Sequence, residues 1–329
     1  MKSTFPLLSL IFITLSTACE PKTAQQPQQA KERQIEFVPE HDADLNPKNK
    51  VDTLQQKEQN QGLLPSDLAL GQSMHYDLSK PTIYQMPTVL DEISGITFIN
   101  GKKDTLYAVQ DEEGLLFSFP LNKEVKSEGI NFSKKGDFED IAFCKDKAFV
   151  LKSNGSIMDI PLSIFKTKKQ DNILEIKGLL PEGEYEGLYA DEATQTLYAL
   201  CKECKDAKKN KQAVGYILKM AADGKISFNG SFTIDVKAIE AKTDIKKNNF
   251  LPSSLAKNKK TNEWYILSAH NSVLVITDLN WKVKQAYHLP ADIFEQPEGI
   301  AFDSQNNLYI SNEKGKVEQG NVLKFSYQK

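Results

Sequence analysis

The sequence predicts an all-β protein, a five-bladed β-propeller with four antiparallel strands in each blade. Three observations lead to this prediction. One short motif returns five times between residues 92 and 303. Each copy opens a stretch of strands and turns that has the length of a propeller blade. The last copy is incomplete at the end of the chain, while an unassigned strand precedes the first copy.

Each copy of the motif has a turn, a small or acidic residue, glycine or a near substitute, and a short apolar strand. The copies are residues 92–98 (EISGITF), 137–143 (DFEDIAF), 184–191 (EYEGLYAD), 251–256 (LPSSLA) and 296–303 (QPEGIAFD). The residues before the glycine position are 45, 47, 67 and 45 residues apart. We expect the extra residues of the long interval to lie in loops 203–213 and 238–250.

A second strand follows every copy, at residues 105–109, 148–151, 196–200, 264–267 and 307–311. A third strand alternates polar and apolar residues, and a fourth follows in most copies. Short β-rich strands separated by Gly, Asn, Asp and Lys turns indicate antiparallel sheets. Four strands in a unit of about 45 residues are typical of a propeller blade.

The fifth copy lacks a fourth strand because the chain ends at Lys329. Residues 82–86 (TIYQM) can supply that strand, which would close the ring through both termini and remove an open sheet edge. Residues 83–327 amount to 245 residues, or 49 for each of five blades. A six-bladed ring is the weaker alternative, because the long interval is too short to hide a further blade.

The N-terminus predicts a lipoprotein signal peptide over residues 1–18. Lys2 precedes an apolar stretch at residues 5–15, and small residues stand before Cys19. Cleavage there would leave the Cys19 thiol to carry the lipid, with palmitate among its acyl chains. Glu20, rather than Asp, at the next position favours the outer membrane by similarity to the sorting rule of such lipoproteins. Ordinary secretion with a chance cysteine is the alternative.

Residues 19–75 are predicted to be a lipid-anchored flexible tether, and residues 76–329 the propeller. Ten of residues 20–74 are Gln and Phe37 is the only aromatic residue there, so little apolar surface is available for burial. We therefore expect a monomeric outer-membrane lipoprotein of a Gram-negative bacterium, on the periplasmic or the cell-surface side. The membrane would be its partner through Cys19.

Composition argues against a nucleic-acid partner and against highly phosphorylated substrates. The 329 residues include 41 Lys and Arg against 44 Asp and Glu, a formal net charge of −3. Arg33 is the only arginine, whereas bidentate binding of phosphate favours arginine. Past the N-terminus, no apolar run reaches the roughly 18 residues that a membrane span needs.

The first strand of each blade lines the channel of a propeller, so the residues before the glycine positions are expected to converge at one channel mouth. These residues are Ser94, Glu139, Glu186, Ser253 and Glu298. Three converging carboxylates repel one another unless a cation neutralises them. Oxygen ligands alone suit Ca²⁺ better than zinc or copper. The sequence therefore predicts a calcium site in the channel, and a hydrated acidic channel without a fixed ion is the alternative.

A second group of candidates stands at the ends of the second strands. It comprises Asp111, Ser153, Glu203, His270 and Glu313, of which Glu203 and Glu313 are the predicted additional metal ligands. Asp137 and Glu184 each precede an anchor glutamate by two residues and share its face in an extended strand. His270 has the chemistry of a general base, but no nucleophile motif stands near it and a structural role is favoured.

Cys201 and Cys204 have the spacing of a redox motif or of half a zinc site. No second CxxC or histidine pair accompanies them. We expect two thiols at the edge of a loop, with a disulfide between them after export as one outcome.

The repeat motifs resemble those of the SdiA-regulated family of bacterial propellers, which is distantly related to NHL-repeat proteins. The resemblance lies in residues 92–97, 185–188, 297–301 and 309–313 and spans about residues 83–327. It implies a five-bladed propeller on an N-terminal membrane anchor, with a calcium site and no established reaction. Cys19 distinguishes this chain from relatives with a transmembrane anchor.

The predicted function is that of an envelope-anchored, calcium-binding propeller that binds a protein or small-molecule ligand. The alternative is a divalent-metal-dependent hydrolase at the channel mouth. Propeller lactonases use Glu, Asn and Asp around one ion, and here only Asn312 and Asp111 come near the Asn and Asp of that set. A phytase-like phosphatase is less favoured, because the chain has almost no arginine.

Overall fold

The computed structural model describes residues 75–99, 105–121, 125, 128–205, 211–245, 249–316 and 318–329. The predicted signal peptide, Cys19 and residues 20–74 of the predicted tether lie outside these ranges. The anchor and its membrane location therefore stay predictions. In the ranges that are described, no helix is both long and apolar enough to cross a membrane.

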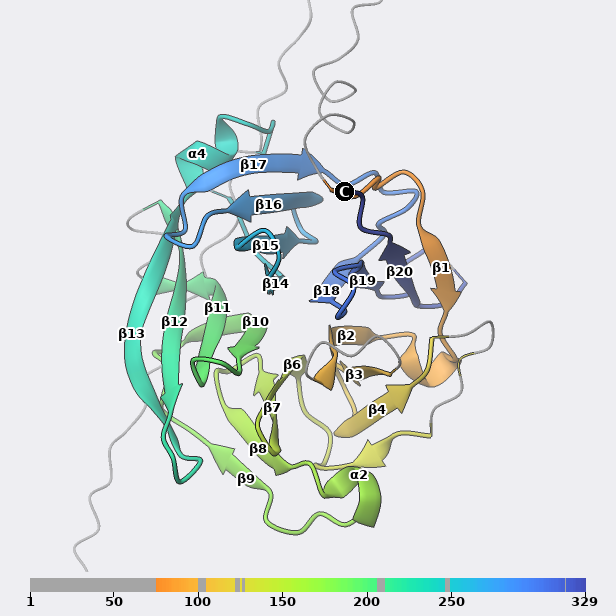
Figure 1. Cartoon of the computed structure of the whole chain (residues 1–329), viewed down its shortest axis with the longest axis vertical. Coiled ribbons are helices and arrows are strands. Elements are labelled where there is room, and N and C mark those ends of the chain that lie inside the picture. The colour runs from red at the N-terminus through yellow and green to blue at the C-terminus, as the bar shows by residue number, and fades with distance from the viewer. Residues whose placement is uncertain are drawn as a thin grey trace, which may run out of the picture. The chain divides into compact units, whose positions relative to one another are not determined.

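Twenty strands of the described chain form five four-stranded antiparallel sheets, arranged in a ring with their first strands innermost (Figure 1). The first blade contains β2 (Ile93–Thr97), β3 (Leu106–Gln110), β4 (Leu115–Phe119) and β5 (Ile130–Asn131). The second contains β6 (Phe138–Cys144), β7 (Lys147–Lys152), β8 (Ile157–Pro161) and β9 (Leu174–Ile176). The third contains β10 (Gly183–Asp191), β11 (Thr196–Cys204), β12 (Gln212–Met220) and β13 (Ile226–Asp235). The fourth contains β14 (Ser254–Asn258), β15 (Glu263–Ser268), β16 (Val273–Thr277) and β17 (Val283–His288).

The fifth blade is closed by both ends of the described chain. It consists of β18 (Pro297–Phe302), β19 (Leu308–Asn312), β20 (Asn321–Phe325) and the N-terminal strand β1 (Thr82–Gln85). β1 pairs antiparallel with β20, from Thr82 opposite Lys324 to Gln85 opposite Asn321. The predicted five-bladed ring and its closure through the termini are both confirmed.

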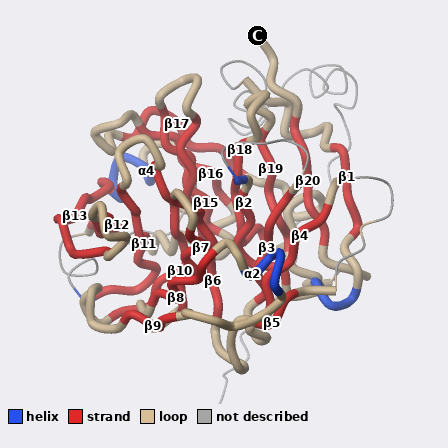
Figure 2. Tube along the Cα trace, turned by 60° about the horizontal axis from the view of Figure 1, so that its bottom comes forward, coloured by secondary structure: helices blue, strands red, loops and turns tan. Residues whose placement is uncertain are grey.

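Short helical turns connect some of the strands, and strands dominate the chain trace (Figure 2). The described turns are η1 (Thr88–Leu90), α2 (Ile164–Thr167) and α4 (Val236–Glu240). The third blade is larger than the others, because β10 to β13 have nine, nine, nine and ten residues. The extra residues of the long interval thus partly extend hydrogen-bonded strands, and the expectation that loops 203–213 and 238–250 hold them is only partly correct.

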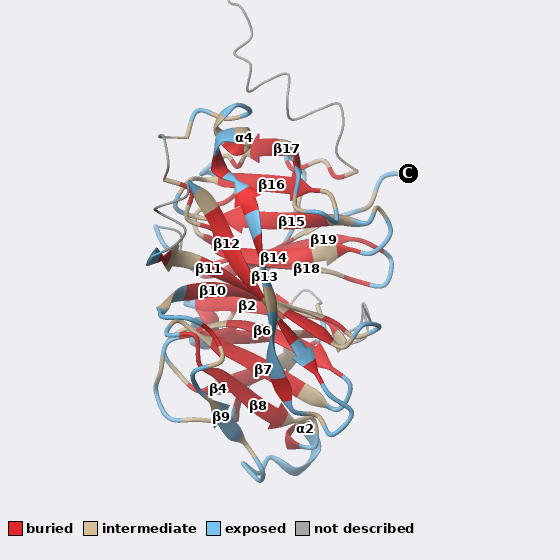
Figure 3. Ribbon diagram, turned by 90° about the vertical axis from the view of Figure 1, so that its left-hand side faces the viewer, coloured by how far each residue is buried: buried red, intermediate tan, exposed pale blue. Residues whose placement is uncertain are grey.

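The core lies between neighbouring blades, where most strand residues are buried (Figure 3). Between the third and fourth blades, the ring of Trp281 stacks on Phe232 at 3.6 Å and on Trp264 at 4.5 Å between ring centroids. Aromatic pairs of this kind add packing energy beyond the area they bury. The aromatic side chains therefore hold adjacent blades together.

Tyr76 attaches the start of the described chain to two blades. Its side chain is fully buried, and its hydroxyl donates to the backbone oxygen of Asn306 at 2.7 Å. The same hydroxyl accepts hydrogen bonds from the side-chain amides of Asn258 and Asn306. This contact adds to the β1–β20 pairing, so the ring is closed by side-chain as well as backbone bonds.

Candidate metal centre at the channel mouth

The three anchor glutamates occupy equivalent irregularities in their blades. The strand registers of β6 on β7, β10 on β11 and β18 on β19 skip Glu139, Glu186 and Glu298, respectively. Each glutamate is therefore the extra residue of a β-bulge, and bulges commonly re-aim a side chain beside a functional site. In the first blade, the register shift between Ile93 and Ile96 takes in Ser94. The repeated motif of the sequence thus corresponds to a repeated bulge.

The residue after each anchor brings the first strands close together. Asp140 is fully buried, and its Oδ2 accepts hydrogen bonds from the Leu188 backbone N at 2.8 Å and the Ser254 hydroxyl at 3.1 Å. Burial raises the pKa of Asp140 well above its usual range. A Cβ at Gly95 would lie 2.2 Å from Asp140 Oδ1 and 2.4 Å from its Cα, so no side chain fits there. Asp140 therefore connects the first strands of four blades.

One half of the mouth is neutralised by groups of the protein itself. The Lys202 ammonium lies 2.7 Å from Glu186 Oε1, with the Glu186 side chain 10% exposed. Burial, and then the charges of Glu186 and Asp137, raise the pKa of Glu139 to about 10. Glu139 is thus protonated at neutral pH and can donate the hydrogen bond that joins its carboxyl to Glu186. One proton and one ammonium offset the charge of this half.

The other half has no such compensation among the described residues. One carboxylate oxygen each from Glu92, Asp111 and Glu313 lie within 4.8 Å of one another. Burial, and then the charge of Glu298, raise the pKa of Glu313 to about 8. Glu298 interacts with charges of both halves: burial, followed by the charge of Glu186, raises its pKa to about 7, while Lys202 opposes this rise and Asp111 adds to it. These shifts show that the mouth accommodates several negative charges poorly.

Asp111 shows most clearly that the negative charge of this half is uncompensated within the described chain. Its Oδ1 atom is buried, and the described part of the chain offers it no hydrogen-bond partner. Burial and the charge of Glu92 raise the pKa of the Asp111 carboxyl. Glu313 does have one polar neighbour, since the Gln296 side-chain amide donates to its Oε2 at 2.9 Å. An unpartnered buried carboxylate oxygen inside an acidic cluster fits a bound cation.

Of the two serines in the predicted ligand set, Ser253 bonds to backbone groups through its hydroxyl, whereas Ser94 accepts a hydrogen bond through its backbone oxygen. The Ser253 hydroxyl donates to the Pro297 oxygen at 2.9 Å and accepts from the Ala269 backbone N at 3.3 Å. The Ser94 backbone oxygen accepts a hydrogen bond from the Ser311 hydroxyl at 2.7 Å. The Ser253 contact with Pro297 joins blades four and five, and the Ser94 contact joins blades five and one.

The remaining candidates lie apart from the compact cluster. Glu203 stands opposite Glu184 in the β10–β11 register. The Ser153 backbone N donates to the backbone oxygen of Asp137, so Ser153 lies just past the end of β7, beside the start of β6. His270 Nε2 lies 2.9 Å from the Asn249 side-chain amide in an exposed contact.

Three residues of the mouth were missed by sequence reasoning: Glu92, Asp140 and Lys202. Glu92 precedes Ser94 by two residues, as Asp137 precedes Glu139, so the same positional rule would have found it. Asp140 stands at the glycine position of the second motif copy, and this departure from the repeat was the signal that could have identified it. Lys202 had no motif signal beyond its position between two cysteines.

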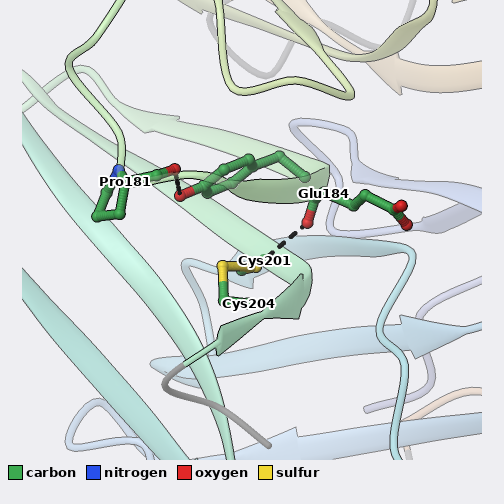
Figure 4. Close-up of a disulfide and its surroundings, with 5 residues drawn as sticks. Pro181, Glu184, Cys201 and Cys204 are labelled. Carbon is green, nitrogen blue, oxygen red and sulfur yellow. Dashed lines mark hydrogen bonds between the residues drawn. A yellow bond between two sulfur atoms is a disulfide. The ribbon is translucent and has the colours of Figure 1, made fainter. Parts of the chain in front are cut away.

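Cys201 and Cys204 form a disulfide with a Cα–Cα distance of 6.1 Å (Figure 4). Both residues are buried, at 1% and 3% exposed, and Cys204 is the last residue of β11 while Cys201 lies inside this strand. The expected position at a loop edge therefore applies to Cys204 alone, and the disulfide is the outcome that the structure shows. Cys201 Sγ lies 3.2 Å from the backbone oxygen of Glu184, on the neighbouring strand. The disulfide engages both sulfur atoms, which leaves neither as a thiolate ligand for zinc.

Of three similar solved structures, the first has a TM-score high enough to support the fold. A luciferin-regenerating enzyme superimposes with a TM-score of 0.50 at 11% identity, over 75% of this chain and 95% of that one. Glutaminyl cyclase of Myxococcus xanthus gives a TM-score of 0.49 at 12% identity, over 75% and 94%. Regucalcin of Agrobacterium tumefaciens, a calcium-binding protein, gives 0.46 at 12% identity, over 71% and 90%. At 11% identity, the likeness to the luciferin-regenerating enzyme extends to the fold alone.

Sequence comparison identifies the family. No curated protein matches the sequence. The family model described as SdiA-regulated matches residues 71–315, which is most of the chain and includes the motif of all five blades. The chain belongs to the SdiA-regulated family.

Proposed function

We propose that this protein is an envelope-anchored propeller that binds one calcium ion at its channel mouth and uses that face to bind a protein or small-molecule partner. The observation that carries the calcium site is the buried, unpartnered Oδ1 of Asp111 within the cluster of Glu92, Asp111 and Glu313. The envelope anchor rests on residues 1–19 of the sequence.

The position of the proposed ion follows from the division of the mouth into two halves. Lys202 and the proton of Glu139 already offset charge around Glu186. Glu92, Asp111 and Glu313 bring three carboxylates together, and burial penalises the charged forms of Asp111 and Glu313. A divalent cation would remove that penalty, because it attracts each carboxylate more strongly than the carboxylates repel one another.

Calcium suits this cluster better than a transition metal. The side chains nearest to one another offer carboxylate oxygens, with the Gln296 amide beside Glu313. Calcium accepts six to eight oxygen ligands in a flexible shell and can complete that shell with water. Zinc and copper prefer nitrogen and sulfur ligands, and the cysteines of the mouth are joined in the disulfide.

Thermal unfolding of the full chain with calcium, and again after chelation with EGTA, tests this function. At a calcium concentration about 100 times the Kd, the midpoint should rise by about 5–10 °C. Asp111→Asn and Glu313→Gln should each remove most of this increase, since each deletes a ligand charge. Glu182→Gln is the matched control, because Glu182 is exposed and pairs with the exposed Lys205.

The absence of any shift with every divalent ion tested would contradict the calcium site. The same preparations can be assayed for opening of a small lactone. If the wild type opens the lactone and Glu313→Gln does not, the protein is a hydrolase and the proposed binding function is wrong.

A further inference from the structure

We propose that Lys202 acts as a tethered cation that closes one half of the channel mouth to metal ions, and that the Cys201–Cys204 disulfide holds it there. The number of calcium ions bound would then depend on the redox state of this cysteine pair. The inference rests on the proposed calcium site and concerns the half of the mouth that this site leaves free.

Lys202 is placed by a second bulge in the strand pairing of the third blade. The β10–β11 register passes from Glu184 opposite Glu203 to Tyr185 opposite Cys201, so it skips Lys202. On the partner strand the same ladder skips Glu186. The two skipped residues form the 2.7 Å ion pair. Since neither belongs to the ladder, regular backbone pairing alone does not hold these two side chains together.

The disulfide supplies the missing constraint. Cys201 and Cys204 flank the bulged residue, and their bond closes a ring that contains Lys202. This ring is packed tightly on β10: a Cβ at Gly183 would lie 2.5 Å from Cys204 Sγ and 3.2 Å from Cys201 Sγ. The local shape of β11 at Lys202 is therefore fixed covalently and by contact with the neighbouring strand.

Reduction would release this constraint. The disulfide takes up two electrons and two protons from a dithiol, which becomes a cyclic disulfide, and two cysteine thiols result. Both sulfur atoms are buried, so the two thiols need more room than the bonded pair in a tightly packed place. The bulge would relax, and the ammonium of Lys202, with a side chain 35% exposed, would gain access to water.

The charge of Lys202 decides what the second half of the mouth can bind. Its ammonium interacts with Glu186 first and also with Glu298 and Glu139. A calcium ion cannot take the same Glu186 oxygen while the ammonium occupies it. Once the lysine leaves, Glu186 and Glu298 lose their nearby positive charge, and a second cation can replace it. The carboxyl oxygens of Glu139, Glu186 and Glu298, from blades two, three and five, are then available as its ligands.

Calcium stoichiometry by isothermal titration on the full chain is the first measurement. The oxidised protein should bind one ion, and the protein reduced with dithiothreitol should bind two. Lys202→Met should bind two ions in both states, whereas Lys202→Arg should behave as the wild type. Lys205→Met is the matched control and should bind one ion when oxidised, because Lys205 pairs with Glu182 at the surface.

The second measurement needs no metal and separates this inference from the calcium site. Acylation of Lys202 by an N-hydroxysuccinimide ester is followed by peptide mass spectrometry, with Lys205 as the internal reference. Reduction should make Lys202 react several-fold faster and leave Lys205 unchanged. An unchanged Lys202 rate overturns the positioning role, whatever the metal content of the protein.

The two measurements give distinguishable failures. If the oxidised wild type binds no calcium while the acylation rate of Lys202 responds to reduction, the proposed calcium site is wrong. The positioning of Lys202 by the disulfide is then still correct. If oxidised and reduced protein bind the same number of ions, control of the site by the disulfide is wrong. Because reduction is applied to the wild-type chain, these tests do not depend on a cysteine variant that folds.

Discussion

Replacement of Gly95 by alanine is expected to lower the free energy of unfolding by about 3 kcal/mol or more. The new methyl group would lie 2.2 Å from Asp140 Oδ1 and 2.4 Å from Asp140 Cα. A side-chain oxygen can rotate away, but a Cα atom moves only with its strand. The first strands of blades one and two would have to separate, and the bonds from Asp140 to Leu188 and Ser254 would weaken with them.

Urea denaturation of the variant, with Gly178→Ala as its control, measures this effect. Gly178 has a positive φ of 72°, and no atom lies within 4 Å of a Cβ built there. The control should therefore lose only the backbone cost of about 1–2 kcal/mol. Combining Gly95→Ala with Asp140→Ala should not restore stability, because the clash with the Cα atom remains. Equal losses in Gly95→Ala and Gly178→Ala would show that the strands are not in close contact here.

The metal-free protein is expected to become less stable as the pH rises from about 5 to 8. Glu298 and Glu313 titrate with a pKa of about 7 and about 8 in the folded chain, against an ordinary value of 4.5. Over this window the folded state holds protons that the unfolded state has released, so the slope of unfolding free energy against pH is negative. The summed loss for these two groups between about pH 5 and 8 should be about 6 kcal/mol.

Chemical denaturation at a series of pH values with EGTA present measures this slope. Carboxylates with a lowered pKa, such as Glu175 beside Lys177 and Lys152, act in the opposite direction, but they titrate mostly below this window. Glu298→Gln and Glu313→Gln should each flatten the curve. Saturating calcium should reverse the trend, because metal binding needs ionised carboxylates. A flat curve for the metal-free wild type would contradict the burial of these charges.

The fold was predictable because the propeller repeats its local chemistry. Every first strand carries the same motif in the same place, so five weak signals add up to one strong signal. The incomplete last copy and residues 82–86 likewise predicted the β1–β20 closure. The size of the third blade was harder to predict, because residues such as Gln212 continue a strand only by pairing with Asp235, far along the chain.

The candidate site was predictable in its anchors but not in its charge balance. Repetition identified Glu139, Glu186 and Glu298, and the structure places each on a bulge. Repetition could not find Lys202, because a lysine between two cysteines occurs in one blade alone. It also did not show that Glu92, Asp111 and Glu313 approach within 4.8 Å.

The sequence by itself determined the number of blades, the closure of the ring and the acidic character of one channel mouth. These properties depend on motifs that recur along the chain and on the count of residues between them. Only the tertiary structure decided which carboxylates are compensated by Lys202 or a shared proton, and which are left with the unpartnered oxygen of Asp111. The reason is physical: repulsion, desolvation and ion pairing depend on distances across different blades, and spacing along a chain does not determine those distances.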